Sequence, residues 1–131
     1  MGLHQALVTR TVDSLLAEAR AGLTRLTPEQ AFDAWQGGAL LVDTRSSDQQ
    51  LEQHGVIPGS LHHPLSVVLW RLDELPRETR IVLICRHGYS SSLAAAQLQQ
   101  MGFTEATDVE GGFEAWAAAG LPVAAVVVSD R

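Results

Sequence analysis

The chain has 131 residues, and its content of 46% hydrophobic and 18% charged residues is typical of a single globular domain rather than of a disordered protein. A formal net charge of −6 argues against a general attraction to nucleic acid or to an anionic membrane. The nine cationic residues are all arginines, so a lysine Schiff base is excluded and any anion site depends on arginine and on backbone N–H groups.

The first predicted elements are two helices and a strand. Over residues 11–23 apolar side chains recur on one helical face, and Thr11 is the expected N-cap. A second helix starts at Thr27-Pro28-Glu29, where an N-cap residue precedes a proline at the first helical position, and it ends at Gly37-Gly38. The apolar run over residues 39–43 predicts a buried strand that ends in Asp43.

The middle of the chain carries weaker signals. The segment 46–60 is polar and closes with a turn signal at residues 57–60. Residues 61–65 predict a short strand, and residues 66–72 predict a short helix that carries Val67, Val68 and Trp70.

The clearest strand signal is RIVLIC, residues 80–85, which runs directly into RHGYSS and then into an alanine-rich helix over residues 92–102. A further strand near residues 106–109 and a helix through Trp116 complete the pattern. Strands that alternate with helices predict an α/β domain on a mainly parallel sheet. Ligands bind at the carboxyl ends of such strands, and Cys85 stands at one of these ends.

The position of Cys85 predicts a reactive thiol. If residues 86–90 curl around the sulfur, their N–H groups and the positive end of the next helix stabilise a thiolate and bind anions. Thiols at helix N-termini have pKa values lowered to roughly 3.5–7.5. Gly88 gives the loop a flexible backbone, and Arg86 gives it a fixed positive charge. The hydroxyl groups of Ser90 and Ser91 can cap the helix or donate to an anion.

The alternative is that Cys85 is a small buried residue at the end of a strand, which is common for a free cysteine. The polar, glycine-containing run that follows it favours the reactive thiol. His87 is a weaker candidate for an acid–base partner, because its place in the loop predicts a solvent-facing ring. His62 and His63 have poor spacing for a metal site.

Four motifs in order resemble the single-domain rhodanese family. They are VDTR (42–45), VIPGS (56–60), CRHGYSS (85–91) and EGGFEAWAAAGLPV (110–123), and the resemblance spans about residues 23–123. It implies a rhodanese-like α/β fold, with a mainly parallel central sheet flanked by helices on both faces. The chain then divides into an N-terminal helical extension (1–22), which is a candidate for an added interface, a rhodanese-like domain (23–125) and a C-terminal tail (126–131).

The resemblance also implies an activity. A protein of this family is a thiosulfate-type sulfurtransferase that moves a sulfane sulfur from a donor such as thiosulfate to a thiophilic acceptor, here through a Cys85 persulfide. Asp43 and Arg45 match supporting positions, and Arg86 is the candidate for steering the anionic donor. The expected substrate-binding residues are Arg86, His87, Gly88, Tyr89, Ser90 and Ser91.

No metal and no cofactor are implied. The expected partners are a small anionic sulfur donor and a thiol or cyanide acceptor, with a sulfur-relay protein as a further candidate and with neither nucleic acid nor membrane. The single cysteine excludes an internal disulfide and fits a reducing compartment. The N-terminal residues show no secretory pattern, and no apolar run approaches the ~20 residues of a membrane span, so the cytoplasm is the expected location.

Two alternative functions share this scaffold. Phosphatases with a rhodanese-like fold have a longer loop that an arginine closes around phosphate, whereas Ser90-Ser91 stands at the closing position here. Non-catalytic binding modules usually lack the cysteine. The chain departs from the family pattern at Val56, where a histidine is usual, and in a longer interval between Arg45 and the turn, which affects one wall of the site but not the nucleophile.

Overall fold

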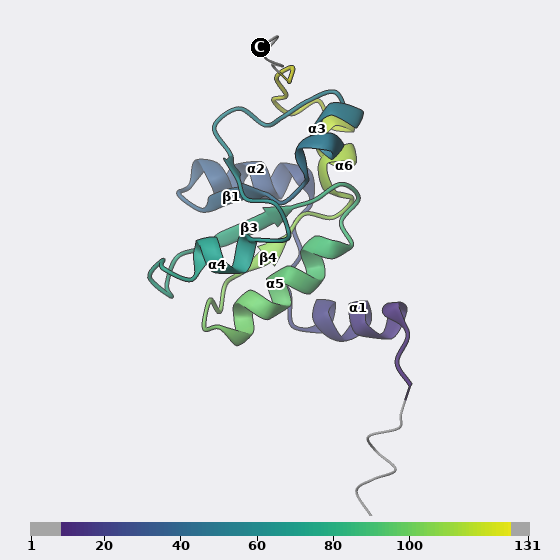
Figure 1. Cartoon of the computed structure of the whole chain (residues 1–131). Coiled ribbons are helices and arrows are strands. Elements are labelled where there is room, and N and C mark those ends of the chain that lie inside the picture. Colours follow the sequence, from purple (N-terminus) through teal and green to yellow (C-terminus); the bar gives the residue numbers. More distant parts are fainter. Residues whose placement is uncertain (1–8, 127–131) are drawn as a thin grey trace, which may run out of the picture.

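A computed structural model describes residues 9–126 of the chain. In this range the elements follow one another as α1 (Val12–Ala21), α2 (Pro28–Gln36), β1 (Leu40–Asp43), α3 (Ser47–Glu52), β2 (Leu61–His62), α4 (Val68–Leu72), β3 (Ile81–Ile84), α5 (Ser90–Gln100), β4 (Thr107–Asp108) and α6 (Gly112–Ala118). Figure 1 shows the strands at the centre of the molecule, between helices on both sides.

The strands form one parallel sheet in the order β2-β1-β3-β4. β1 pairs with β3 over its whole length, and Leu83 of β3 pairs with Asp108 of β4. Because the strands are parallel, Asp43, Ile84 and Asp108 lie at the same edge of the sheet. The predicted α/β architecture with a parallel sheet is confirmed.

Both faces of the sheet are covered. Ile81 and Leu83 of β3 pack in a cluster with residues of α4 and α5, and Val82 and Ile84 pack in a second cluster with residues of α2 and α6. A strand that is buried on both faces needs apolar side chains at every position, which explains the unbroken apolar run of β3. α1 packs on α5, outside these two layers (Figure 1).

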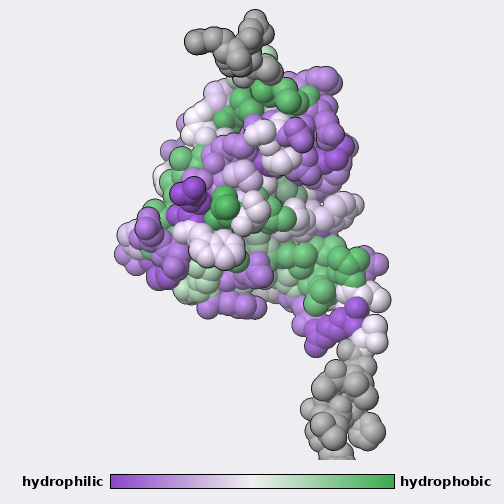
Figure 2. Space-filling view, viewed as in Figure 1, coloured by the Kyte–Doolittle hydropathy of each residue, from purple (hydrophilic) through white to green (hydrophobic). Residues whose placement is uncertain are grey.

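The predicted helix starts are confirmed. Thr11 and Thr27 are the N-caps of α1 and α2, and each forms a capping box with the residue three positions later. The predicted apolar face of α1 is only partly buried, because Val12 is 62% exposed while Leu16 and Ala19 are buried. Figure 2 shows hydrophobic surface in the region of this helix.

Two expectations for the middle of the chain need correction. The polar segment 46–60, for which only a turn was predicted, contains α3, whose N-cap Ser46 forms a capping box with Gln49. β2 covers Leu61–His62 alone rather than residues 61–65. Residues 127–131 of the predicted tail and residues 1–8 of the predicted extension lie outside the described residues. Between residues 9 and 126, none of the helices combines the length and the hydropathy that crossing a bilayer requires.

Candidate active site

Cys85 lies directly after β3, at the carboxyl edge of the sheet, and is 4% exposed. The loop that follows turns back into α5, which starts at Ser90. Gly88 has a φ of +88°, and a Cβ at this position would lie 2.8 Å from the nitrogen of Gly111. Glycine is therefore required for the chain to curl so tightly beside the sulfur.

Two hydrogen bonds reach the sulfur of Cys85. The Gly88 N–H donates to Sγ at 3.1 Å, and the thiol donates to Oγ of Ser91, also at 3.1 Å. α5 begins without a side-chain cap, so the expectation that Ser90 and Ser91 cap this helix is wrong. Ser91 faces the sulfur instead.

The same contacts determine the acidity of the thiol. Burial by itself raises the pKa of Cys85. Hydrogen bonds from the side chain and backbone of Ser91, the side chain of Ser90 and the backbone of Gly88 outweigh burial, and together they hold the pKa of Cys85 below its ordinary value. The site thus favours a thiolate.

Behind Ser91 lies Asp108, which no sequence motif indicated. Asp108 is fully buried, and its Oδ2 accepts hydrogen bonds from Ser91 Oγ and Ser92 Oγ, each at 2.7 Å. A continuous set of contacts therefore runs from Cys85 through Ser91 to a carboxylate. Asp108 lies in the strand predicted near residues 106–109, but only the order of the sheet shows that this strand pairs with β3.

The other predicted loop residues face outward. Arg86 forms an ion pair with Glu52 of α3 at 3.6 Å, and their side chains are 45% and 58% exposed. His87 Nδ1 lies 3.0 Å from Glu114 Oε2 of α6. Tyr89 is also exposed. The structure therefore places acidic partners beside a loop whose own sequence contains none.

Asp43 and Arg45 form a buried ion pair next to the site. Arg45 Nη2 lies 2.7 Å from Asp43 Oδ2, and the guanidinium also donates to the Gly55 carbonyl at 2.9 Å. It lies 3.7 Å from the centre of the Phe113 ring, and the Phe113 N–H in turn donates to the carbonyl of Cys85. Gln50 of α3 also donates to Asp43 Oδ2 at 3.2 Å, so the pair contacts α3 and α6 and reaches Cys85 through Phe113, without touching Sγ.

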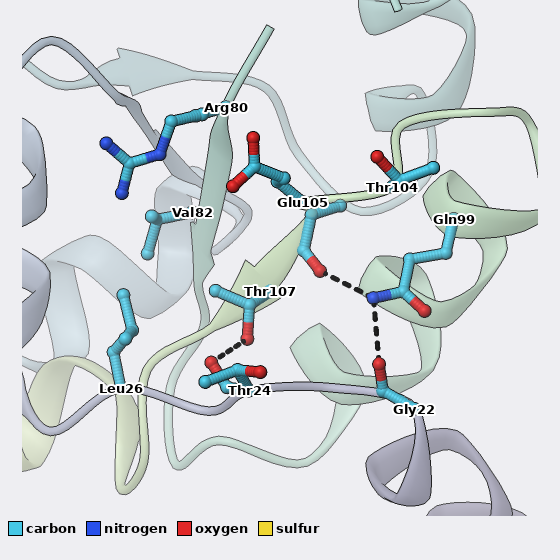
Figure 3. A pocket seen from close by; sticks show the side chains of 10 residues that line it. Gly22, Thr24, Leu26, Arg80, Val82, Gln99, Thr104, Glu105 and Thr107 are labelled. Atoms are coloured by element: carbon cyan, nitrogen blue, oxygen red, sulfur yellow. Dashed lines mark hydrogen bonds between the residues drawn. The ribbon is translucent and has the colours of Figure 1, made fainter. Parts of the chain in front are cut away.

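A hollow of about 270 Å³ lies at the opposite end of the sheet from Cys85 (Figure 3). Its lining carries no thiol and no histidine; the lining residues are Gly22, Thr24, Leu26, Arg80, Val82, Gln99, Thr104, Glu105, Ala106 and Thr107. Across residues 9–126, no three His, Cys, Asp or Glu side chains gather as a metal site would require. The free thiol of the described chain is that of Cys85, at the other end of the sheet.

The sequence comparison gives the family. Residues 27–119 match the family model of the rhodanese-like domain. This chain belongs to the rhodanese-like domain family. The family predicted from the four motifs is confirmed, and the match includes Cys85 and its loop.

The relatives of this rhodanese-like chain include named sulfurtransferases. The thiosulfate sulfurtransferase GlpE of Pseudomonas savastanoi pv. phaseolicola is 40% identical over 97 residues, which cover 72% of this chain and 87% of that protein. A sulfurtransferase of Allochromatium vinosum is 37% identical over 86 residues, which cover 66% of this chain and 78% of that protein. These names agree with the predicted sulfurtransferase activity.

A solved structure also resembles this rhodanese-like fold. It is the protein of unknown function RPA3614 of Rhodopseudomonas palustris, described as a possible tyrosine phosphatase. It superimposes with a TM-score of 0.76 at 29% identity, covering 89% of this chain and 96% of that chain. The phosphatase alternative therefore has to be decided from the residues around Cys85.

Proposed function

We propose that this rhodanese-like protein is a thiosulfate-type sulfurtransferase in which Cys85 carries the transferred sulfur. One observation carries this most directly: the only cysteine lies at the carboxyl edge of the sheet, with the Gly88 N–H and the Ser91 hydroxyl at its sulfur. The lowered pKa of Cys85 increases the fraction of thiolate at a given pH, so the proposed reaction uses no separate general base.

The reaction proceeds in two displacements. The Cys85 thiolate attacks the outer sulfur of thiosulfate, the S–S bond of the donor breaks, and sulfite leaves with the bonding electron pair. Cyanide or an acceptor thiolate then attacks the outer sulfur of the Cys85 persulfide, and the thiolate of Cys85 leaves with its electron pair. The cycle balances without an external oxidant or reductant.

The surroundings of Cys85 suit a sulfur carrier. The residue is 4% exposed, which shields a persulfide from side reactions with water. The N–H of Gly88 donates to the sulfur and stabilises its anionic form in both steps, and Ser91 lowers the pKa of Cys85. The exposed side chains of Arg86, His87 and Tyr89 are proposed to border the route by which the donor arrives.

A phosphatase needs a guanidinium that closes the loop around phosphate with two parallel hydrogen bonds. Ser90 and Ser91 occupy that position here, and Arg86 is paired with Glu52. A non-catalytic binding module would have no need for a thiol whose pKa is lowered by its own loop. Sulfur transfer therefore remains the function that this site supports best.

The proposed substrates are a small anionic sulfur donor and a cyanide or thiol acceptor, and a sulfur-relay protein is a further candidate. A single free cysteine fits a reducing compartment, so the proposed location is the cytoplasm. The division of the chain into an extension (1–22) and a domain (23–125) is also proposed, with α1 of the extension packed on α5 of the domain.

Intact-mass measurement after incubation with thiosulfate tests the function. We expect the protein to gain the mass of one sulfur atom, and we expect cyanide to remove it and to form thiocyanate. A parallel incubation with an aryl phosphate tests the phosphatase alternative. Cys85-dependent hydrolysis of the aryl phosphate, without any sulfur adduct, would show that the proposed function is wrong.

A further inference from the structure

Two arginines near the N-terminal end of the described chain meet at the loop that carries Cys85. Arg20 Nη2 donates to the carbonyl oxygen of Gly88 at 2.8 Å, and Arg25 Nη2 donates to the same oxygen at 3.0 Å. Both arginines precede residue 27, where the family match begins. The N–H of Gly88 donates to the sulfur, so one residue contacts the arginines at its carbonyl and Cys85 at its nitrogen.

Helix α1 holds Arg20 in place. Leu16 and Ala19 are buried, and the helix packs along α5 (Figure 1). Arg20 Nε also donates to Ser92 Oγ at 3.1 Å, and its guanidinium lies 5.7 Å from the centre of the Tyr89 ring. α1 therefore brings one cation into contact with the loop and with the first turn of α5.

The segment after α1 holds Arg25 in a similar way, and Figure 3 shows its attachments. Gln99 Nε2 donates to the Gly22 carbonyl at 3.0 Å, and Thr107 Oγ1 donates to the Thr24 carbonyl at 2.8 Å. These bonds tie the backbone on the N-terminal side of Arg25 to α5 and to β4. The side chain of Arg25 consequently starts from a backbone that is fixed against the sheet.

Asp108 links Arg25 to the serine that contacts the sulfur. Arg25 Nε lies 2.9 Å from Asp108 Oδ1, and the two side chains are 16% and 0% exposed. The other carboxylate oxygen accepts from Ser91 and Ser92. A buried carboxylate without a cation is unfavourable and would oppose a thiolate nearby, so the arginine charge lets Asp108 bind the serines without that penalty.

We propose that Arg20 and Arg25 are positioning residues for Cys85, so that the N-terminal extension supports the active site through Arg20. Both hold the Gly88 carbonyl, which keeps the Gly88 N–H directed at the sulfur, and Arg25 also offsets the charge of Asp108. This role rests on the proposed function for the identity of the reactive group, but it concerns the thiolate and is independent of the sulfur donor.

Other charged groups also lie around the loop. On the solvent side, Arg86 of the loop pairs with Glu52 of α3, and His87 of the loop pairs with Glu114 of α6. Beside β1, Asp43 and Arg45 form a buried pair. These groups are the same in every variant compared below. Their influence on the pH dependence of Cys85 therefore cancels between variants.

The test compares Arg20→Gln with Arg20→Lys and with a matched control, Arg10→Gln. Arg10 lies just before α1 and pairs with Glu18 on the exposed surface, so the control removes the same charge away from the loop. The first measurement is the rate of Cys85 alkylation by iodoacetamide over a pH series. The second is kcat/KM for thiosulfate with cyanide as the acceptor, and thermal unfolding confirms that each variant is folded.

We expect Arg20→Gln to move the alkylation midpoint upward by about one pH unit and to lower kcat/KM by about 5- to 30-fold. Arg20→Lys retains the charge and should recover part of both effects, whereas Arg10→Gln should match the wild type. A folded Arg20→Gln variant with the wild-type midpoint would overturn the role of Arg20. If this variant does not fold, Arg25→Gln provides the same test with the same contradicting result.

The two measurements also separate this role from the proposed function. If the wild type transfers no sulfur but Arg20→Gln still raises the alkylation midpoint, the proposed function is wrong and the positioning role stands. If the wild type transfers sulfur and Arg20→Gln leaves the alkylation midpoint unchanged, only the positioning role is wrong.

Discussion

The inner and outer sides of the Cys85 loop both carry charged groups, but these groups differ in burial. On the inner side, Asp108 is fully buried and pairs with Arg25 at 2.9 Å. On the outer side, Arg86 and Glu52 lie 3.6 Å apart with side chains 45% and 58% exposed. Removing one partner of a buried pair costs about 3–5 kcal/mol, whereas an exposed pair contributes about 0–1 kcal/mol. The inner side is therefore expected to determine the reactivity of Cys85.

Within the loop, different groups face solvent and face the sulfur. The charged and aromatic side chains of the loop, Arg86, His87 and Tyr89, face solvent. The groups at the sulfur are the backbone N–H of Gly88 and the hydroxyl of Ser91. The charged side chains of the loop therefore do not contact the sulfur, and we expect them to affect only the approach of a donor.

The largest effect is expected from Cys85→Ser. Since the chain has one cysteine, this substitution should reduce thiosulfate:cyanide transfer to the uncatalysed background and should abolish the sulfur adduct. Serine is close in size to cysteine, so the unfolding transition should stay near that of the wild type. Transfer that persists in the folded variant would contradict the role assigned to Cys85 and to the whole inner side.

Asp108→Asn breaks the buried pair on the inner side. It leaves Arg25 without its carboxylate partner, and we expect the free energy of unfolding in urea to fall by about 3–5 kcal/mol. Asp73→Asn is the matched control, because Asp73 pairs with Arg77 on the surface, where the side chains are 60% and 42% exposed. Its cost should stay below about 1 kcal/mol, and equal costs for the two variants would remove the contrast between buried and exposed pairs.

Ser91→Ala tests the acidity of the thiol. The hydroxyl of Ser91 lowers the pKa of Cys85, so its removal should raise that pKa and shift the pH midpoint of iodoacetamide alkylation upward by about half a unit to one unit. The alkylation midpoint of the wild type should lie below the pH at which a free thiol ionises, because a lowered pKa means more thiolate at lower pH. Ser60→Ala is the control, since its hydroxyl donates to the Ile57 carbonyl. A midpoint in Ser91→Ala equal to that of this control would show that the hydroxyl does not stabilise the thiolate.

The smallest effect is expected on the outer side, from Arg86→Ala. The sequence alone favours Arg86 as a strong contact for an anionic donor, but its pairing with Glu52 offsets its charge. We expect the KM for thiosulfate to rise by no more than about 5-fold and the effect to shrink as salt is added. Glu52→Gln should act in the opposite direction and lower the KM, because it frees the Arg86 charge. A much larger increase in Arg86→Ala would place Arg86 among the groups that bind the donor directly.

The elements of the fold with local signals were predicted well. The apolar run RIVLIC predicted β3, and Thr11 and Thr27 marked the starts of α1 and α2, because strand patterns and caps depend on residues a few positions apart. α3 was missed since its six residues, SDQQLE, are mostly polar and lack an apolar face. Its one local signal was the capping box between Ser46 and Gln49.

The sequence by itself determined where the thiol of Cys85 lies. A strand that ends in Cys85 and runs into a glycine-containing loop and a helix can place the thiol only at the carboxyl edge of a parallel sheet, and this needs no knowledge of distant residues. The four motifs likewise determined the family. Both inferences depend on short stretches of chain, in which spacing alone carries the information.

Only the tertiary structure decided which charges surround that group. Arg20 is 68 residues from Gly88, and Arg25 is 83 residues from Asp108. These contacts exist because β4 pairs beside β3 and because α1 packs on α5, and both arrangements follow from burying apolar surface throughout the domain. The spacing of residues along the sequence does not predict such packing, so the polar network behind Cys85 could be found only in the folded structure.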